Sequence, residues 1–218
     1  MIKKIKKILF NKGIKVKIMY KKFYDKCEIN SKEILFQSYD GKSFSCNPYY
    51  MFLEICKSKN YDDYKKVIVL NNRIIDEVKN KIKKLGYKNV EFVIFNSKEY
   101  AQKLASTKFL INNVTFPTWF VKKSGQKYLN TWHGTPLKTL GRSIKDAKYE
   151  IGNVQRNFLM ADFLLCPNNF TFEAIKKDYM LDNLFKGEYL LCGYPRNKIF
   201  HDLEMQKSIR EELNLQNN

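Results

Sequence analysis

The sequence has no long hydrophobic segment. Nothing in its 218 residues approaches the run of about 18 apolar residues that a membrane-spanning helix requires. Residues 1–10 are rich in lysine and lack the apolar stretch of a signal peptide, so we expect a cytoplasmic protein. Apolar residues still make up 44% and aromatic residues 15% of the chain, which favours a packed core over disorder.

Sequence patterns that bind metals or nucleotides are also absent. The five cysteines are odd in number and scattered, and no CxxC or Cys/His spacing suggests zinc. We expect reduced, mostly buried thiols at Cys27, Cys46, Cys56, Cys166 and Cys192. There is no Walker P-loop, no GxGxxG after a strand and no DxD pair. The isolated pair Asp62-Asp63 indicates a solvated turn, so we expect neither a metal nor a cofactor.

Arginine is scarce in a strongly basic chain. The formal net charge is +18, yet only five of the 40 basic residues are arginine. Proteins that read nucleic acids usually rely on arginine for bidentate contacts. The abundance of lysine, asparagine and isoleucine is also typical of an A/T-biased gene. A charge of this size still attracts anions, which leaves acidic lipid, a phosphate polymer and nucleic acid as candidate partners.

Two amphipathic patterns occupy the amino-terminal residues. Residues 1–11 place Ile2, Ile5 and Leu9 on one helical face with lysines around it. Such a helix can lie on an anionic membrane or pack on its own domain, and the sequence leaves both open. Residues 14–21 alternate apolar and mostly basic side chains, which predicts a half-exposed strand.

From residue 33 onward, short apolar strands alternate with helices. Strands are expected at residues 33–39, 67–70, 90–95, 109–112, 128–131, 163–166 and 189–192. Helices are expected at 47–57, 74–85, 97–104, 154–160 and 171–179, with a polar helix from 201 and a hairpin-like loop at 122–125. The expected N-caps are Asn47, Ser97 and either Asn169 or Thr171, and the expected helix stop is Gly86. This alternation predicts an α/β fold with a mainly parallel sheet.

The segment QKYLNTWHGTPLKTLG, residues 126–141, holds His133, one of only two histidines. An apolar strand leads into it, and Gly134 and Pro136 follow, which is how α/β enzymes present a catalytic group at the end of a strand. Histidine titrates near neutrality and can take a proton from a hydroxyl. The same pattern also fits a structural histidine in a tight turn.

Two further strand ends carry residues that could hold phosphate. Asn168 follows the strand at 163–166 and precedes a helix whose amino terminus could bind an anion. Arg196 follows the last strand and could bind phosphate or pair with a carboxylate. The spacing alone does not decide between these roles.

These segments resemble a known family. NTWHGTPLKTLG (130–141) is similar to the signature of the CDP-glycerol:poly(glycerophosphate) glycerophosphotransferases, the teichoic acid polymerases and primases. FQSYDGKSFSCNPYYMF (36–52), RNFLMADFLLCPNNFT (156–171) and GYPRN (193–197) resemble three further blocks of that family, in the same order. The resemblance covers residues 36–200, most of the chain.

The resemblance implies a GT-B type enzyme with two Rossmann-like halves, of which this chain is the amino-terminal one. Such enzymes move glycerol phosphate from CDP-glycerol to the terminal hydroxyl of a lipid-linked acceptor and release CMP. Carried over, His133 would be the general base of an in-line phosphoryl transfer. The residues expected to bind substrate, judged by residue type, are Gly134, Thr135, Lys138, Asn168 and Arg196.

The chain departs from the family pattern in two residues and in extent. Lys198 stands where the family commonly has aspartate, and Ser143 where an acidic residue often occurs. The family's second half carries most cytidine contacts and another important histidine. We do not find it here, so we expect a catalytically weak chain and a separate donor-domain polypeptide as a candidate partner. The expected parts are a basic leader helix and strand (1–30), a Rossmann-like acceptor-side domain (31–200) and a connector helix (201–218).

The leading interpretation is therefore half of a polyol-phosphate transferase in teichoic acid or capsule-like polymer biosynthesis, peripheral on the anionic inner face of the cell membrane. The transferred unit is glycerol phosphate or a related polyol phosphate. One alternative is a non-catalytic module that keeps the acceptor- and membrane-binding surfaces. Another is a basic nucleic-acid-binding protein, which only the net charge favours, because no helix-turn-helix, RRM or zinc pattern is present.

Overall fold

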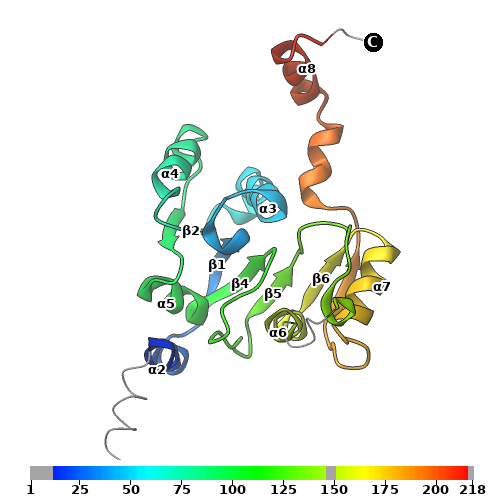
Figure 1. Ribbon diagram of the computed structural model, residues 1–218. Helices are drawn as coiled ribbons and strands as arrows, with labels where there is room; N and C mark the ends of the chain where they lie inside the picture. Colours follow the sequence, from blue (N-terminus) through cyan, green and yellow to red (C-terminus); the bar gives the residue numbers. More distant parts are fainter. Residues whose placement is uncertain (1–11, 146–150, 216–218) are drawn as a thin grey trace, which may run out of the picture.

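The fold is built around one parallel β-sheet. The computed structural model describes residues 12–145 and 151–215, and in these the sheet has seven strands in the order β3-β2-β1-β4-β5-β6-β7 (Figure 1). Each strand pairs in parallel with its neighbour. The strands are β1 (Asn30–Gln37), β2 (Lys65–Leu70), β3 (Val90–Ile94), β4 (Thr107–Asn112), β5 (Lys127–Asn130), β6 (Phe163–Cys166) and β7 (Glu188–Leu191). The predicted α/β, Rossmann-like parallel sheet is confirmed.

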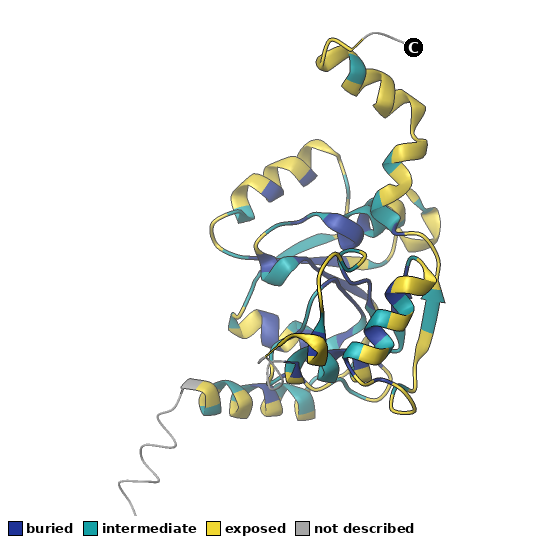
Figure 2. Ribbon diagram, turned by 45° about the vertical axis from the view of Figure 1, so that its right-hand side comes forward, coloured by how far each residue is buried: buried dark blue, intermediate teal, exposed yellow. Residues whose placement is uncertain are grey.

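Helices cover both faces of the sheet. The covering helices are α2 (Lys12–Lys26), α3 (Cys46–Lys57), α4 (Ile75–Lys84), α5 (Lys98–Ser106), α6 (Gly152–Met160) and α7 (Asn169–Asp178), whereas α8 (Leu203–Glu212) does not pack on the sheet. Short 3-10 helices are η1 (Tyr39–Gly41), η2 (Lys59–Tyr61), η3 (Gly141–Ser143) and η4 (Pro195–His201). Because strand side chains alternate, Leu35 and Val69 pack with α5 and α6, whereas Phe36 and Ile68 pack with α3 and α4. Buried residues concentrate in the sheet and on the inner helix faces (Figure 2).

The strand order places a topological switch point between β1 and β4. From β1 the chain adds β2 and β3 on one side, and then returns past β1 to add β4 to β7 on the other. Ligands of such sheets bind outside the carboxyl ends of the strands, beside the switch point. The register sets Gln37 beside Asn112, and Asn112 beside Asn130, at this edge. The segments that follow β1, β4 and β5 therefore lie close together.

The prediction of a strand at residues 14–21 is wrong, because these residues lie within helix α2. Their apolar side chains alternate, but Val16, Tyr20 and Phe23 also recur at helical spacing. Tyr20 is buried, and its hydroxyl donates a hydrogen bond of 2.6 Å to the carbonyl oxygen of Val121. The sequence of this segment fits both the two-residue period of a strand and the 3.6-residue period of a helix. The packing of α2 on α5 therefore decides in favour of the helix.

Two predicted helix caps are also wrong. The N-cap of α3 is Ser45, so Asn47 lies inside the first turn instead. The N-cap of α7 is Asn168, whose Oδ1 accepts a hydrogen bond of 2.8 Å from the backbone N–H of Thr171, rather than Asn169 or Thr171 itself. In both cases the chain enters its helix one or two residues earlier than the sequence pattern indicates.

Other local predictions are settled by hydrogen bonds and strand direction. Ser97 caps α5 by accepting a hydrogen bond of 3.0 Å from the backbone N–H of Tyr100, as predicted. Gly86 follows α4 with a φ of +70°, as expected for a helix stop. Residues 122–125 do not form a hairpin, because the flanking strands β4 and β5 are parallel.

The structure tests the prediction for the carboxyl-terminal helix but not the one for the amino-terminal helix. The basic helix predicted for residues 1–11 lies outside the described residues. The polar helix predicted after residue 201 is present as α8, which projects from the sheet and is almost entirely exposed (Figures 1 and 2). Within the part of the chain that the structure describes, no helix is long and apolar enough to cross a membrane. The domain boundaries at residues 30 and 200 stay predictions.

Gly141 is required by the packing of η3 on α7. Its φ is +52°, and a Cβ at this position would lie 2.1 Å from the carbonyl oxygen of Asp178. We therefore expect Gly141→Ala to lower the free energy of unfolding by roughly 2–4 kcal/mol, measured by chemical denaturation. Gly152→Ala at the start of α6 is the control, since no described group outside its own helix lies within 4 Å of the Cβ position. Equal losses in the two variants would contradict this account.

Candidate active site

A sharp backbone turn at the end of β5 presents His133. Trp132, the preceding residue, has a φ of +49°, a left-handed conformation that is unfavourable for a bulky side chain. Neighbouring side chains hold this turn. Asn130 Oδ1 accepts a hydrogen bond of 2.9 Å from the backbone N–H of Trp132, and the Thr131 hydroxyl donates one of 3.0 Å to the Trp132 carbonyl oxygen. The chain thus leaves the sheet abruptly at its carboxyl edge.

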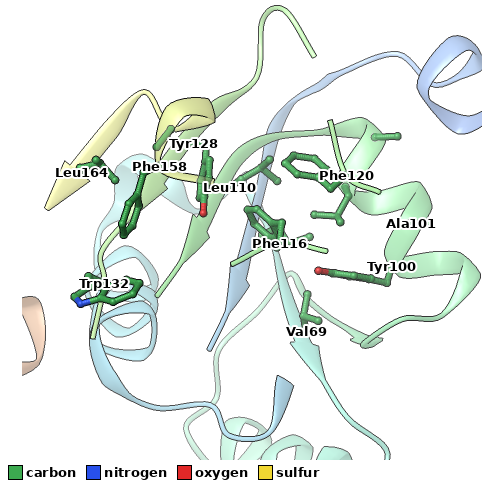
Figure 3. Packing of buried hydrophobic residues seen from close by; sticks show 14 of the residues in the cluster. Val69, Tyr100, Ala101, Leu110, Phe116, Phe120, Tyr128, Trp132, Phe158 and Leu164 are labelled. Carbon is green, nitrogen blue, oxygen red and sulfur yellow. The ribbon is translucent and has the colours of Figure 1, made fainter. Parts of the chain in front are cut away.

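The His133 ring packs beside two aromatic side chains. It stacks on the indole of Trp132 with ring centres 4.2 Å apart, and the Tyr39 ring lies 6.0 Å away. Trp132 in turn packs against Phe158 in the core (Figure 3). Burial and then the positive charge of Arg196 lower the pKa of His133 below its ordinary value of 6.5. The imidazole is therefore mainly neutral at pH 7 and able to accept a proton.

Arg196 lies against the backbone of His133, near the start of η4. Its Nη1 donates to the carbonyl oxygen of His133 at 2.8 Å and to the sulfur of Cys46 at 3.3 Å. The guanidinium carbon lies 5.1 Å from the centre of the Tyr194 ring. Among the residues that the structure describes, no carboxylate comes within ion-pair distance of Arg196. Of the two roles that the sequence left open for Arg196, the described contacts favour anion binding over a carboxylate pair.

One cavity gathers all six residues that the sequence predicted for the site. Its volume is 840 Å³, within the range of small-molecule sites, and its lining follows the ends of β5, β6 and β7. The predicted residues that line it are His133, Gly134, Thr135, Lys138, Asn168 and Arg196. The structure thus brings these residues together, while the role of each stays a prediction.

Three of these lining residues have surroundings that bear on their roles. Asn168 caps α7 and also donates from Nδ2 to the hydroxyl of Thr135 at 3.4 Å, which ties the loop after His133 to the start of α7. A Cβ at Gly134 would lie 3.8 Å from its nearest described neighbour, Arg196 Nη2, so no described contact requires glycine there. The room beside Gly134 is therefore open to a ligand.

Sequence reasoning missed four residues of the site. Tyr39 lies beside the His133 ring, Cys46 and Asn47 hold Arg196 from the first turn of α3, and Tyr194 lies under its guanidinium. All four fall within blocks that resemble the family, which was the only signal available. Nothing in residue type or periodicity marks them, because they act through contacts between distant segments.

The cysteines and acidic residues of the described chain form no metal site. No group of three His, Cys, Asp or Glu among the described residues could hold a metal ion. All five cysteines are free of disulfide bonds. Cys46 and Cys166 are buried, Cys27 and Cys56 are half-buried, and Cys192 is exposed. The prediction of mostly buried thiols is therefore confirmed only at Cys46 and Cys166.

The charge of Arg196 should be measurable at His133. We expect Arg196→Gln to raise the pKa of His133 toward 6.5, so that the ring holds its proton to a higher pH. NMR titration of the ring Cε1–H signals measures this, since His201 is the only other histidine. Arg73→Gln removes an exposed arginine that does not line the cavity and serves as the control. An unchanged pKa in Arg196→Gln would mean that burial alone lowers it.

Known proteins with similar sequences indicate the family to which this chain belongs. The family model described as CDP-Glycerol:Poly(glycerophosphate) glycerophosphotransferase matches residues 18–218. The chain is 30% identical to the teichoic acid poly(glycerol phosphate) polymerase of Bacillus spizizenii over 191 residues, 84% of this chain and 45% of that protein. It is 27% identical to the teichoic acid glycerol-phosphate transferase of Staphylococcus aureus over 198 residues, 85% of this chain and 47% of that protein.

Solved structures with a similar fold include those of a teichoic acid polymerase. A variant of the wall teichoic acid polymerase TagF soaked with CDPG matches with a TM-score of 0.75 and 27% identity, over 99% of this chain and 52% of that one. A second TagF structure matches with a TM-score of 0.72 and 28% identity, over 99% of this chain and 54% of that one. The chain thus spans about half the length of each of these four matches. The matched span includes the whole sheet and every residue of the cavity, and the chain belongs to the CDP-glycerol:poly(glycerophosphate) glycerophosphotransferase family.

Proposed function

We propose that this chain supplies the acceptor-side half of a GT-B type transferase in teichoic acid or capsule-like polymer biosynthesis. The enzyme would move glycerol phosphate, or a related polyol phosphate, from CDP-glycerol to a lipid-linked acceptor. The observation that carries the proposal is one cavity in which a neutral His133 lies beside Arg196, a cation that no described carboxylate neutralises. A proton acceptor next to a positive charge suits attack by a hydroxyl on a phosphate.

The proposed chemistry uses these two groups in one step. The acceptor's terminal hydroxyl gives its proton to the imidazole of His133, and its oxygen forms a bond to the β-phosphorus of CDP-glycerol. The bond from that phosphorus to the bridging oxygen breaks, and CMP leaves. Arg196 and Lys138 offset the negative charge on the phosphate oxygens. The family description and the TagF crystal soaked with CDPG support CDP-glycerol as the donor.

The surface beside the cavity suits an extended acceptor. A second hollow of 590 Å³ shares Pro136, Leu137 and Lys138 with the first and continues along α7 past Phe170 and Lys177. Its lining mixes lysines with apolar and acidic side chains. A chain of alternating polyol and phosphate groups offers hydroxyls and charges to such a path.

We also propose that the protein lies on the inner face of the cell membrane and that α2 contributes to the contact. The net charge is +18, and α2 presents exposed lysines, among them Lys17, Lys21 and Lys22, around Ile18, which is 45% exposed. An exposed apolar side chain among lysines is typical of a helix that lies on an anionic lipid surface. Attachment there would bring the cavity to a lipid-linked acceptor.

The proposed base is tested by mutation in the intact transferase that contains this chain. We expect His133→Ala to lower kcat for glycerol phosphate transfer by about 10²- to 10⁴-fold, with little change in CDP-glycerol binding, because the variant lacks only the proton acceptor. Transfer from labelled CDP-glycerol to an acceptor measures this. His201→Ala removes the exposed second histidine and should keep full activity.

Two results of this assay would contradict the proposal in different ways. Full activity in His133→Ala would exclude His133 as the base while leaving the reaction itself in place. No transfer by the wild-type protein would instead favour the non-catalytic module.

The membrane contact is tested with vesicles. We expect vesicles that contain anionic lipid to retain the protein, and the double variant Lys17→Glu/Lys22→Glu to bind roughly tenfold or more weakly, because each lysine near the surface contributes. Co-sedimentation measures the bound fraction. Lys83→Glu/Lys84→Glu on α4 makes the same charge change on another exposed helix. Equal weakening by both pairs would show that net charge, rather than α2, governs binding.

A further inference from the structure

Asn47 joins the two segments that present His133 and Arg196. It lies in the first turn of α3 and is fully buried. Its Nδ2 donates to the carbonyl oxygens of Thr131 and Trp132 at 3.4 Å and 3.3 Å. Its Oδ1 accepts a hydrogen bond of 3.3 Å from the backbone N–H of Arg196. One side chain therefore connects the end of β5 to the start of η4.

Arg196 completes a closed set of hydrogen bonds. Its Nη1 donates to the carbonyl oxygen of His133 at 2.8 Å, next to the two carbonyl groups that Asn47 binds. Asn47 and Arg196 are 149 positions apart in the sequence, yet both bind the same short stretch of backbone. A shift of either one would move the peptide that carries the His133 ring.

The backbone at this point needs support from outside β5. Trp132 has a φ of +49°, and a bulky residue keeps a left-handed conformation only where its surroundings hold it there. Asn130 and Thr131 hold the turn from within its own segment. Asn47 holds it from a different element and fixes it relative to Arg196.

We propose that Asn47 is a positioning residue that sets the place of His133 relative to Arg196. It does not line the cavity, so it acts through these two residues rather than on a substrate. An amide suits this role because it donates to carbonyl groups and accepts from an N–H at once, which neither alanine nor aspartate can do. The catalytic meaning of the inference rests on the proposed function, whereas the geometry can be tested without it.

Gln126 provides a matched control. Its Nε2 also donates to two backbone carbonyl oxygens, of Leu104 at 2.9 Å and Thr107 at 2.7 Å, and its Oε1 accepts a hydrogen bond of 2.8 Å from the backbone N–H of Lys123. It is 2% exposed. Because it precedes β5, it lies at the opposite edge of the sheet from the cavity. Its removal deletes an equivalent set of hydrogen bonds away from His133.

The experiment compares Asn47→Ala with Gln126→Ala in the chain described here. Both variants should lose stability. Only Asn47→Ala should raise the pKa of His133, by roughly 0.5 pH units or more, because the ring becomes better solvated and moves away from Arg196. NMR titration of the ring protons measures this. Tyr39, which lies beside the ring, and Cys46, which contacts Arg196, keep their side chains in both variants.

Inorganic phosphate serves as a second probe. We expect its affinity to fall roughly fivefold in Asn47→Ala and to stay unchanged in Gln126→Ala, because only the first variant frees the Arg196 backbone. If phosphate fails to bind the wild-type chain, the proposed anion-binding role of Arg196 fails. The pKa of His133 still tests the role of Asn47 in that case.

Two outcomes would overturn the inference. The first is a His133 pKa that is equal in the wild type and in Asn47→Ala, with stability lost as in Gln126→Ala. That result would make Asn47 a purely structural residue.

Asn47→Ser keeps one hydrogen-bonding group and should give a smaller rise in the pKa of His133. If neither Asn47 variant folds, the wild-type protein decides, because the side-chain NH₂ protons of Asn47 should exchange slowly with solvent. Fast exchange of these protons is the second outcome that would overturn the inference.

Discussion

The left-handed turn at Trp132 is the constraint around which the carboxyl edge of this domain is arranged. Trp132 buries its indole against Phe158, while its backbone must reverse so that the next side chain faces outward. The indole anchors the turn in the core and also forms the surface on which the His133 ring stacks. Glycine would relieve the backbone but would lose both contacts. The strain and the anchor therefore come from the same residue, and polar side chains of neighbouring segments hold it.

The polar residues at this edge are mostly neutral amides, and this has an electrostatic consequence. Gln37 accepts a hydrogen bond of 2.6 Å from the Tyr100 hydroxyl, and Asn113 accepts one of 3.0 Å from the backbone N–H of Tyr39. Amides satisfy the backbone groups where buried strands end, and they bring no net charge into the site. The field of Arg196 at His133 is therefore not cancelled by the groups that hold the loops. Carboxylates in the same places would raise the pKa of His133 and pair with Arg196.

The sequence predicts the sheet well because its signal is local. The strand at 163–166 agrees residue for residue with β6, since a short apolar run is bounded by polar turn residues there. The six predicted site residues meet in one cavity because they all follow strands whose carboxyl ends share an edge. The helix α2 could not be recognised, because its contact with α5 decides the periodicity. The role of Asn47 could not be recognised either, because its hydrogen-bond partners Thr131 and Trp132 lie 84 and 85 positions away in the sequence.

The placement of Arg196 gives the proposed base a dependence on its substrate. In the free protein the guanidinium field helps to lower the pKa of His133, so the ring is neutral and ready to take a proton. A phosphate bound to Arg196 would offset that field, and the pKa of His133 would rise toward its ordinary value of 6.5. A base whose pKa lies closer to the working pH drives proton transfer better. His133 would thus become a stronger base once a phosphate is bound at Arg196. This is also the phosphate that the acceptor hydroxyl, after giving its proton to His133, must attack. Without phosphate, burial and then the charge of Arg196 keep the pKa of the ring below 6.5.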